Sequence, residues 1–225
     1  MAIRSLNGVA IHIAKEPARL AGGWLVHFAS EGAQIALSGG GTAGAAYDAA
    51  AELLPEWPDA HVWFGDERAV PPDDERSNYR LARERLLDRL RIPPAVHRIQ
   101  AELGASAAAE HYDRELDGVS LDLALNGIGA DGHTASLFPK APALDERERR
   151  AVAAEAGLEP FVERVTLTPP LFAATRLLVY LATGASKAEA IRRAFAEEPS
   201  PETPASLIRG VETIAILDAA AASQL

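Results

Sequence analysis

The sequence contains no cysteine among its 225 residues. This absence excludes a disulfide framework, cysteine-ligated zinc, iron–sulfur clusters and a thiol nucleophile. Long hydrophobic runs are missing as well, because no stretch approaches the roughly 18 consecutive apolar residues of a membrane span. Residues 1–17 also lack the long apolar segment and small-residue cleavage site of a secretory signal. We therefore expect a cytoplasmic protein that does not enter a membrane.

Positive charge is scarce, and lysine is the scarcest part of it. The chain carries 22 basic and 32 acidic residues, for a net charge of −10. This balance disfavours nucleic acid and anionic membrane surfaces as partners. Only Lys15, Lys140 and Lys187 are lysines. An anionic ligand must therefore be bound locally, and a lysine inside a motif is informative.

Alanine, by contrast, is abundant, with 46 residues. Short β-like runs alternate with alanine-rich helical ones, which predicts an α/β fold: a mainly parallel open sheet with helices on both faces, Rossmann-like. We find no repeat or linker and expect residues 1–225 to form a single domain, a monomer or weak homo-oligomer. The expected strands are 9–13, 34–37, 61–64, 121–125, 164–167, 177–182 and 213–217, and the expected helices are 18–30, 43–54, 77–90, 106–116 and 186–196.

The predicted sheet also indicates where a ligand binds. In open α/β sheets, ligands bind outside the carboxyl ends of the strands, where the strand order switches. Four segments that follow expected strands are rich in glycine or in functional groups. These segments are residues 38–42, 65–68, 127–133 and 183–187.

The first of these segments is Ser38-Gly39-Gly40-Gly41-Thr42, between a strand and a helix. Glycines let backbone N–H groups turn toward a ligand, and a helix N-terminus adds partial positive charge. Gly39, Gly40, Gly41 and Thr42 are therefore candidates to bind a phosphate. The segment matches neither the GxxxxGK[ST] loop nor the GxGxxG fingerprint of nucleotide sites. A tight glycine turn without a ligand is the alternative interpretation.

The richest segment is 127–139, in which three glycines surround Asp131 and His133. A constrained loop after a buried strand can aim both side chains at one small volume. Of the six histidines, His133 is the candidate for catalysis, since imidazole can take and return a proton near neutral pH. No spacing typical of zinc ligands accompanies it, so we expect no metal and no cofactor.

Charged residues also follow the expected strand 61–64. Charge at such a buried position is unfavourable unless the groups pair or serve a ligand, so Asp66 and Arg68 are candidate site residues. A salt-bridged loop is the alternative. Ser77 is a candidate helix N-cap, and Asn78 beside it is a candidate substrate contact.

Two further basic residues complete the set of candidates. Arg164 begins an extended segment, and Lys187 stands at the start of an expected helix. A lysine in the first turn opposes the helix dipole, so its presence there indicates a nearby anion. A solvated surface lysine is the alternative.

In order along the chain, segments 65–68, 77–79, 131–139, 164–168 and 184–188 resemble the motifs of the 6-phosphogluconolactonase family. The most specific part reads DGHTASLFP, and the resemblance covers almost the whole chain. It implies the fold shared with glucosamine-6-phosphate isomerase/deaminase. It also implies hydrolysis of 6-phospho-D-glucono-1,5-lactone to 6-phosphogluconate, the second step of the oxidative pentose phosphate pathway. The partner is then a small phosphorylated sugar lactone.

The chain departs from the family pattern in its glycine loop. The family loop usually reads Ser-Gly-Gly-Ser-Thr-Pro, whereas this chain has Gly41 and Ala43 at the second serine and the proline. A side-chain hydroxyl is therefore missing from the phosphate loop, although the backbone cradle remains.

On this interpretation, His133 is the general base toward water and then returns its proton to the leaving ring oxygen. Asp131 orients the imidazole or the substrate. Arg68, held by Asp66, supplies charge near the carbonyl or the ring hydroxyls. The 6-phosphate is bound by residues 39–42, Arg164 and Lys187.

Two rival interpretations remain. The related isomerase/deaminases of glucosamine 6-phosphate carry a Glu five residues after the histidine of the DGH motif, where this chain has Phe138. They also tend to carry Asp-Glu-Tyr where this chain has Asp66-Glu67-Arg68. Both differences favour the lactonase. A non-catalytic sugar-phosphate sensor needs an output module, for which this acidic chain has no room.

Overall fold

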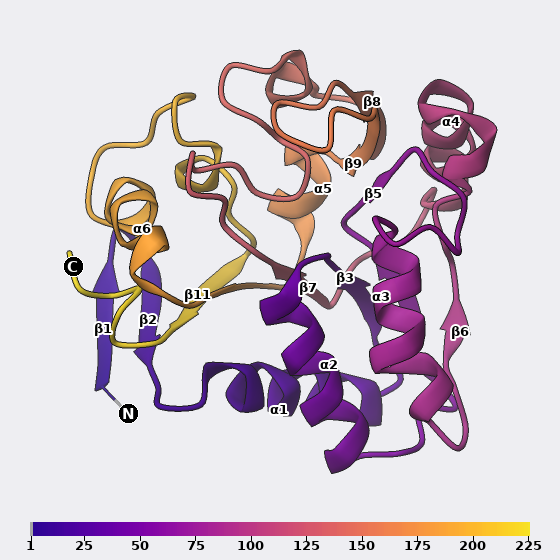
Figure 1. The fold of residues 1–225 in the computed structure, drawn as a ribbon, viewed down its shortest axis with the longest axis horizontal. Helices are drawn as coiled ribbons and strands as arrows, with labels where there is room; N and C mark the ends of the chain where they lie inside the picture. Colours follow the sequence, from indigo (N-terminus) through magenta and orange to yellow (C-terminus); the bar gives the residue numbers. More distant parts are fainter. Residues whose placement is uncertain (1) are drawn as a thin grey trace.

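The computed structural model describes residues 2–225, and Figure 1 shows the arrangement of their helices and strands. The strands are β1 (Ala2–Leu6), β2 (Val9–Ile13), β3 (Gln34–Leu37), β4 (His61–Phe64), β5 (Asp66–Arg68), β6 (Ala95–Val96), β7 (Leu123–Asn126), β8 (Ala151–Ala154), β9 (Arg164–Leu167), β10 (Leu177–Ala182) and β11 (Glu212–Leu217). The α-helices are α1 (Pro17–Ser30), α2 (Gly41–Leu53), α3 (Asn78–Arg85), α4 (Ala105–Glu115), α5 (Pro169–Ala174) and α6 (Ala188–Phe195). The 3₁₀ helices are η1 (Leu87–Arg89), η2 (Ala101–Leu103), η3 (Pro142–Asp145), η4 (Ala185–Lys187) and η5 (Pro204–Ser206).

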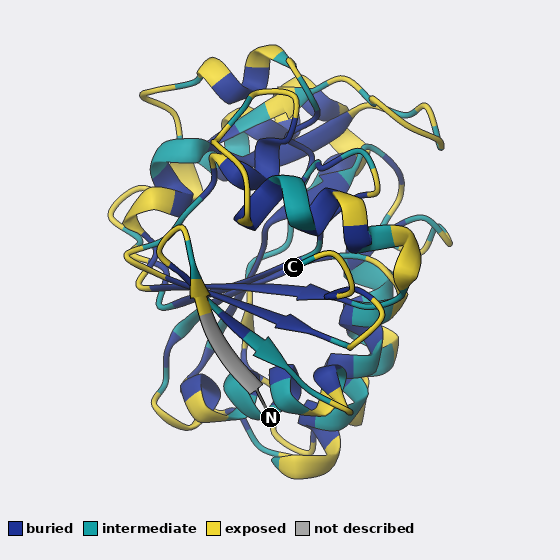
Figure 2. Cartoon of the chain, turned by 90° about the vertical axis from the view of Figure 1, so that its left-hand side faces the viewer, coloured by how far each residue is buried: buried dark blue, intermediate teal, exposed yellow. Residues whose placement is uncertain are grey.

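Eight strands form the main sheet, in the order β1-β2-β11-β10-β7-β3-β4-β6. β1 is antiparallel to β2, and the other neighbours in the sheet are parallel. Figure 2 shows this sheet close to edge-on, with further structure on both of its faces. The prediction of a mainly parallel α/β sheet is thus confirmed. A second, antiparallel sheet has the order β5-β9-β8 and begins directly after β4.

The central strands are apolar runs because both faces of the sheet are covered. All six residues of β10 are buried, and so are all four of β7. The abundant alanine allows close helix packing: a Cβ on Gly22 of α1 would lie 2.9 Å from the carbonyl oxygen of Ala46 in α2. Larger side chains at this contact would push the two helices apart.

The expected elements and the observed ones agree best in the buried strands. Residues 34–37, 61–64, 164–167 and 177–182 match β3, β4, β9 and β10 residue for residue. The helix expected over 77–90 ends at Arg85, because Leu86 leaves the helical region with φ −132° before η1 begins. The helix expected over 186–196 begins only at Ala188, after the 3₁₀ turn η4. β1, β5, β6 and β8 are strands that the sequence pattern does not predict.

The strand order switches between β3 and β7. From β3 the chain continues outward to β4 and β6, and from β7 it continues to β10 and β11 on the other side. The carboxyl ends of β3 and β7 therefore diverge into two sets of loops. This is the position at which an open α/β sheet binds its ligand.

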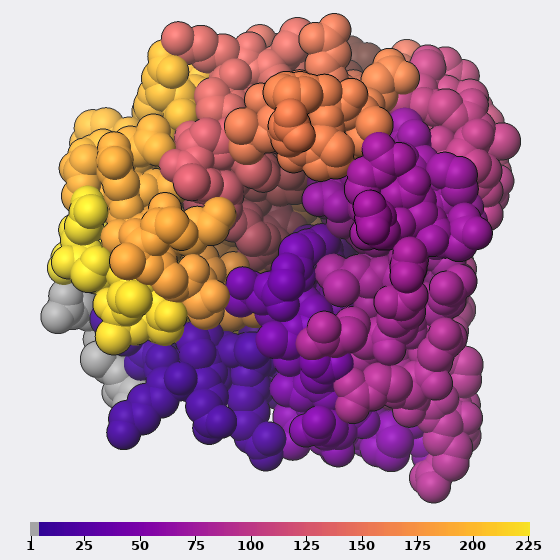
Figure 3. All heavy atoms as spheres, viewed as in Figure 1, coloured from indigo at the N-terminus to yellow at the C-terminus, as the bar shows by residue number. Residues whose placement is uncertain are grey.

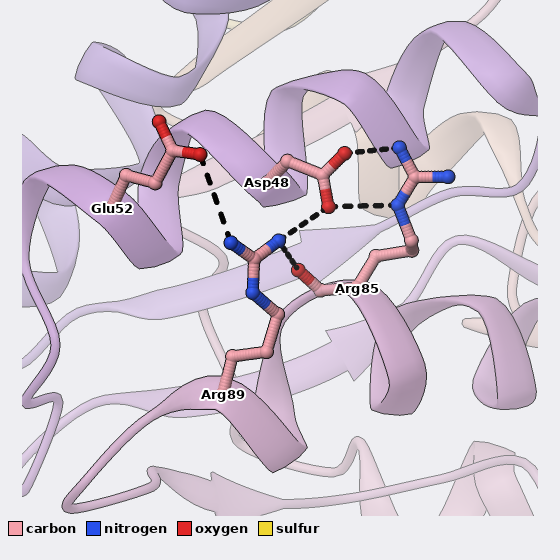
Figure 4. A network of polar contacts seen from close by, with 4 residues as sticks. All are labelled: Asp48, Glu52, Arg85 and Arg89. Atoms are coloured by element: carbon pink, nitrogen blue, oxygen red, sulfur yellow. Dashed lines mark hydrogen bonds and ion pairs between the residues drawn. The ribbon is translucent and has the colours of Figure 1, made fainter.

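Asp48 of α2 is the centre of an ion-pair network with α3 and η1 (Figure 4). Its Oδ1 accepts a hydrogen bond from Arg85 Nε at 2.7 Å and another from Arg89 Nη1. Arg89 also lies 3.7 Å from Glu52. The Arg85 hydrogen bond, partly opposed by burial and aided by the charge of both arginines, lowers the pKa of Asp48. The network therefore ties α2 to the end of α3 and to η1.

We expect Asp48→Asn to lower the free energy of unfolding at pH 7 by about 1 kcal/mol, discounted because the arginines are 43% and 39% exposed and screened by water. The melting temperature should fall by about 2–4 °C. A lowered folded-state pKa stabilises the fold above the unfolded-state pKa, and this stabilisation is lost as the pH falls through the folded-state value. Thermal unfolding of both proteins at pH 7 and at about pH 3 should show the difference shrinking in acid.

Glu84→Gln is the matched control for this prediction. It removes one exposed i,i+4 pair with Arg80, at 2.7 Å, rather than a shared carboxylate. Its effect on stability should be clearly smaller than that of Asp48→Asn, because water screens an exposed pair. Equal losses in the two variants, or a difference that does not change with pH, would contradict the network's role.

Candidate active site

A cleft of about 340 Å³ opens where β3, β7 and β10 end. Figure 3 shows a hollow near the middle of this face of the molecule. The sequence predicts eleven site residues, and nine of them line the cleft. These nine are Gly39, Gly40, Gly41, Thr42, Asp66, Arg68, Asn78, His133 and Lys187. Asp131 and Arg164 are not part of its lining.

The glycine loop runs from the end of β3 into α2. Gly40, at the N-cap of α2, has φ +97°, a conformation that favours glycine. Gly39 is required for a different reason: a Cβ there would lie 1.9 Å from Asn78 Oδ1. The loop is also held from behind, since Tyr47 OH donates a hydrogen bond to the Ser38 carbonyl. The loop backbone and the start of α2 thus face the cleft.

We expect Gly39→Ala to destabilise the protein by about 1–3 kcal/mol, the usual effect of overpacking a tight site. Asn78 cannot move aside easily, because it is 1% exposed and donates two hydrogen bonds to Asp66. Gly41→Ala is the matched control for stability, since a Cβ at Gly41 has no atom within 4 Å. Chemical denaturation of the two variants checks this, and equal stability would show that the contact with Asn78 can relax.

Asp131 and His133 form a hydrogen-bonded pair on the loop after β7. Asp131 Oδ1 lies 2.6 Å from His133 Nδ1 and also accepts a hydrogen bond from the His133 backbone N–H. Gly129 allows this pairing, because a Cβ there would lie 2.1 Å from Nδ1. With Nδ1 engaged, Nε2 is the ring nitrogen that remains for a ligand in the cleft.

The Asp131 carboxylate stays available as a partner for the imidazole. Burial alone would raise the pKa of Asp131, but the hydrogen bond and charge of His133 outweigh burial and lower it. His133 lines the cleft, whereas Asp131 does not. This arrangement is consistent with a role for Asp131 in orienting the imidazole. Phe138, at the position where the deaminases have Glu, packs against His133 with ring centroids 4.8 Å apart.

The expectation that Asp66 holds Arg68 is wrong. Asp66 Oδ1 accepts a hydrogen bond from Asn78 Nδ2 at 3.0 Å, and Oδ2 accepts one from Ser136 Oγ at 2.6 Å. Arg68 instead donates from Nη1 to the Arg76 carbonyl. The reason is that neutral donors meet both oxygens of Asp66, one from Asn78 at the start of α3 and one from Ser136 on the loop after β7. Arg68 remains in the wall of the cleft.

Glu67 is a structural residue that sequence reasoning left without a role. Its carboxylate accepts hydrogen bonds from the backbone N–H groups of Arg68, Asn78 and Tyr79 and from Ser77 Oγ. Burial raises the pKa of Glu67, whereas these four hydrogen bonds oppose the rise. The expected Ser77 cap is confirmed, since Ser77 Oγ accepts from the Arg80 N–H. Hydrogen bonds between Glu67 and the start of α3, rather than a salt bridge, therefore hold the segment after β4 in place.

Arg164 stands outside the phosphate loop. It is 3% exposed, lies opposite Arg68 in the pairing of β9 with β5, and donates from Nη2 to the Pro160 carbonyl at 3.0 Å. Burial, and then the positive charge of Arg68, lowers the pKa of Arg164. The expectation that Arg164 joins the glycine loop in the cleft lining is not met, because its buried side chain donates to the Pro160 carbonyl instead.

Lys187 is the last residue of η4 and lines the cleft beside the glycine loop. No ion pair of Lys187 is found with any residue of the described chain 2–225. Two polar cleft residues, Thr183 and Asn126, are not among the eleven predicted site residues, although Thr183 lies in the segment 183–187 expected near a ligand. Thr183 Oγ1 lies 3.3 Å from Thr42 Oγ1, and Asn126 at the end of β7 has a buried Oδ1 without a hydrogen-bond partner among the described residues. Polar residues directly after apolar strands are the signal that could have revealed both.

Residues 2–225 hold no group of three or more His, Cys, Asp or Glu that could bind a metal ion. None of their helices is long and apolar enough to cross a membrane.

A family model described as glucosamine-6-phosphate isomerases/6-phosphogluconolactonase matches residues 24–216. The chain belongs to this family. Within it, a 6-phosphogluconolactonase of Synechocystis sp. is 39% identical over 204 residues, covering 85% of this chain and 84% of the relative. The human 6-phosphogluconolactonase is 40% identical over 154 residues, covering 65% of this chain and 60% of its own. The resemblance expected from the motifs is confirmed.

Solved structures agree with this family assignment. The 6-phosphogluconolactonase from Trypanosoma brucei superposes with a TM-score of 0.84 at 27% identity, covering 100% of both chains. A monomeric glucosamine-6-phosphate deaminase superposes with a TM-score of 0.82 at 20% identity, covering 96% of this chain and 99% of that chain. The second likeness shows the shared fold, as the motifs implied.

Proposed function

We propose that this chain hydrolyses 6-phospho-D-glucono-1,5-lactone to 6-phospho-D-gluconate in the oxidative pentose phosphate pathway. One observation carries the proposal: the Asp131–His133 pair presents an imidazole nitrogen in a cleft that also holds a glycine loop and a lysine. The names of the family relatives above support the same reaction.

The chemistry needs one proton acceptor that later becomes a proton donor. His133 Nε2 takes a proton from water, and the water oxygen bonds to the lactone carbonyl carbon, giving a tetrahedral oxyanion. Collapse of the oxyanion breaks the bond from that carbon to the ring oxygen, which receives the proton from His133. The new carboxylic acid then loses a proton to solvent. Asp131 holds Nδ1 and balances the positive charge that the imidazole gains in between.

The remaining cleft residues bind the substrate. The backbone N–H groups of 39–42, the N-terminus of α2 and Lys187 bind the 6-phosphate, because all three favour an anion. Arg68 faces the carbonyl or the ring hydroxyls, with Asn78 beside it. Arg164, which lies opposite Arg68 in the pairing of β5 with β9, adds positive charge beside it. Phosphate binding far from the reacting carbon supplies energy that positions the lactone.

The test is a side-by-side assay of two substrates. Lactone generated in the cuvette by glucose-6-phosphate dehydrogenase should open to 6-phosphogluconate faster with the protein than in buffer. Glucosamine 6-phosphate should release no ammonia. Ammonia release without lactone hydrolysis would replace the proposal with the deaminase activity, and tight 6-phosphogluconate binding without turnover would replace it with a sensor.

The proposal extends to the state of the chain. Residues 1–225 act as one domain in the cytoplasm, as a monomer or weak homo-oligomer, without nucleic acid or membrane as partner. The net charge of −10 supports the absence of nucleic acid and anionic membrane as partners. Light scattering coupled to size-exclusion chromatography checks the oligomeric state; an obligate oligomer would contradict it.

A further inference from the structure

Ser136 lies behind the cleft, and neither the mechanism nor the phosphate site above uses it. It is 1% exposed, and its Oγ donates a hydrogen bond to Asp66 Oδ2 at 2.6 Å. Oδ1 of the same carboxylate accepts from Asn78 Nδ2 at 3.0 Å. Two neutral donors therefore fix both oxygens of a carboxylate that lines the cleft.

The turn that delivers Ser136 is conformationally strained. The Leu137 N–H donates to the Thr134 carbonyl at 3.0 Å, and Ala135 between them has φ +49°. Residues with a Cβ rarely adopt this left-handed conformation, and it persists where the surroundings enforce it. Here the Ser136 backbone N–H donates to Thr166 Oγ1 at 3.2 Å. The backbone is thus held in the one orientation that turns Oγ to Asp66.

The hydrogen bond from Ser136 Oγ to Asp66 joins two parts of the site that lie far apart in the sequence. Ser136 belongs to the loop that also carries His133, whereas Asp66 begins β5 in the second sheet. Asp66 lies opposite Thr166 in the pairing of β5 with β9, so Ser136 contacts both partners of that pair. The position of Asp66 relative to the imidazole therefore depends on Ser136.

We propose that Ser136 is a positioning residue that fixes Asp66 as the acceptor for a hydroxyl group of the sugar ring. The inference rests on the proposed function, whose substrate carries these hydroxyls on its ring and whose product keeps them on its open chain. A carboxylate oxygen has more than one lone pair, so Asp66 can accept a sugar hydroxyl while it keeps Ser136 and Asn78. Asp66 then acts by orientation, and proton transfer stays with His133.

The test is a double-mutant cycle on Ser136→Ala and Asp66→Ala, read as the Kd for 6-phosphogluconate and as kcat/KM for the lactone. Each single variant should weaken binding about tenfold, the value of a good hydrogen bond. The double variant should be no weaker than Asp66→Ala, because Ser136 acts through Asp66. Asp66→Asn replaces Asp66→Ala if the alanine variant does not fold.

A matched control separates positioning from general stability. Ser206 is 3% exposed and hydrogen-bonded to Ser200, outside the cleft. Ser206→Ala should lower the melting temperature and leave the Kd unchanged. Losses that multiply in the double variant, or a wild-type Kd in Ser136→Ala, would overturn the role of Ser136. A wild-type protein that binds 6-phosphogluconate without opening the lactone overturns the proposed function alone, while the cycle on Kd still decides Ser136.

Discussion

His133→Ala should lower kcat for lactone hydrolysis by about 10²–10⁴-fold, the usual contribution of a positioned general acid–base. KM should change little, because the imidazole contributes to proton transfer rather than to binding of the phosphate. The fold should survive, since the His133 side chain is 24% exposed and its removal leaves no large cavity. Initial rates, corrected for spontaneous lactone opening, measure the effect.

Asp131→Ala provides the matched control for the histidine. It removes the 2.6 Å hydrogen bond to Nδ1 but leaves the imidazole, so its loss in kcat should be smaller than that of His133→Ala. The double variant should be no slower than His133→Ala alone, because the two residues act as a unit. A His133→Ala protein that keeps the wild-type kcat would remove the histidine from the mechanism, and multiplying losses would separate Asp131 from it.

Lys187→Ala should raise KM for the lactone by roughly 10–100-fold, as expected from losing one charge-assisted hydrogen bond to a phosphate. The loss should fall on KM more than on kcat, since the phosphate lies away from the reacting carbon. Inorganic phosphate as a competitive inhibitor gives an independent measurement. Its inhibition constant should rise by a similar factor in the variant.

Lys140→Ala is the matched control for charge. It also removes one of the three lysines, but Lys140 is 67% exposed and pairs with Glu202 on the surface at 2.6 Å. Its KM should equal that of the wild type. If both lysine variants raise KM equally, the effect belongs to the net charge of the protein. If neither does, Lys187 does not bind the phosphate.

The parts of the fold that the sequence predicts are those with one strong physical cause. β3, β4 and β10 follow from largely apolar runs, β9 follows from alternating polar and apolar residues, and the bounds of all four are as expected. β5 could not be predicted, because its residues, Asp66–Arg68, are charged and form a strand only by pairing with β9. β8 depends on the same partner. Such pairing joins segments far apart in the chain, and no local pattern encodes it.

The candidate site also has a part that the sequence predicts and a part that depends on contacts between distant segments. His133, the glycine loop and Lys187 follow strands directly, so the topology alone brings them to one cleft. The hydrogen-bond partners of the site residues are harder to predict from the sequence. Asp66 and Arg68 are two residues apart and opposite in charge, yet Asp66 bonds to Ser136, 70 residues away. The prediction for Arg164 fails for a similar reason, because the sequence does not reveal that this side chain is buried and donates to the Pro160 carbonyl. The position of residues directly after strands predicts which side chains meet in the cleft. Contacts between loops that are distant in the sequence decide which of these side chains form hydrogen bonds with one another.

The direct test of the account is an NMR time course of 6-phospho-D-glucono-1,5-lactone opening, recorded in parallel for buffer, wild type and His133→Ala. We expect the wild-type protein to convert the lactone to 6-phosphogluconate well above the spontaneous rate. The His133→Ala protein should return the time course close to that of buffer. A wild-type time course that overlays the buffer control would contradict the proposed lactonase activity, and equal acceleration by both proteins would contradict the histidine mechanism.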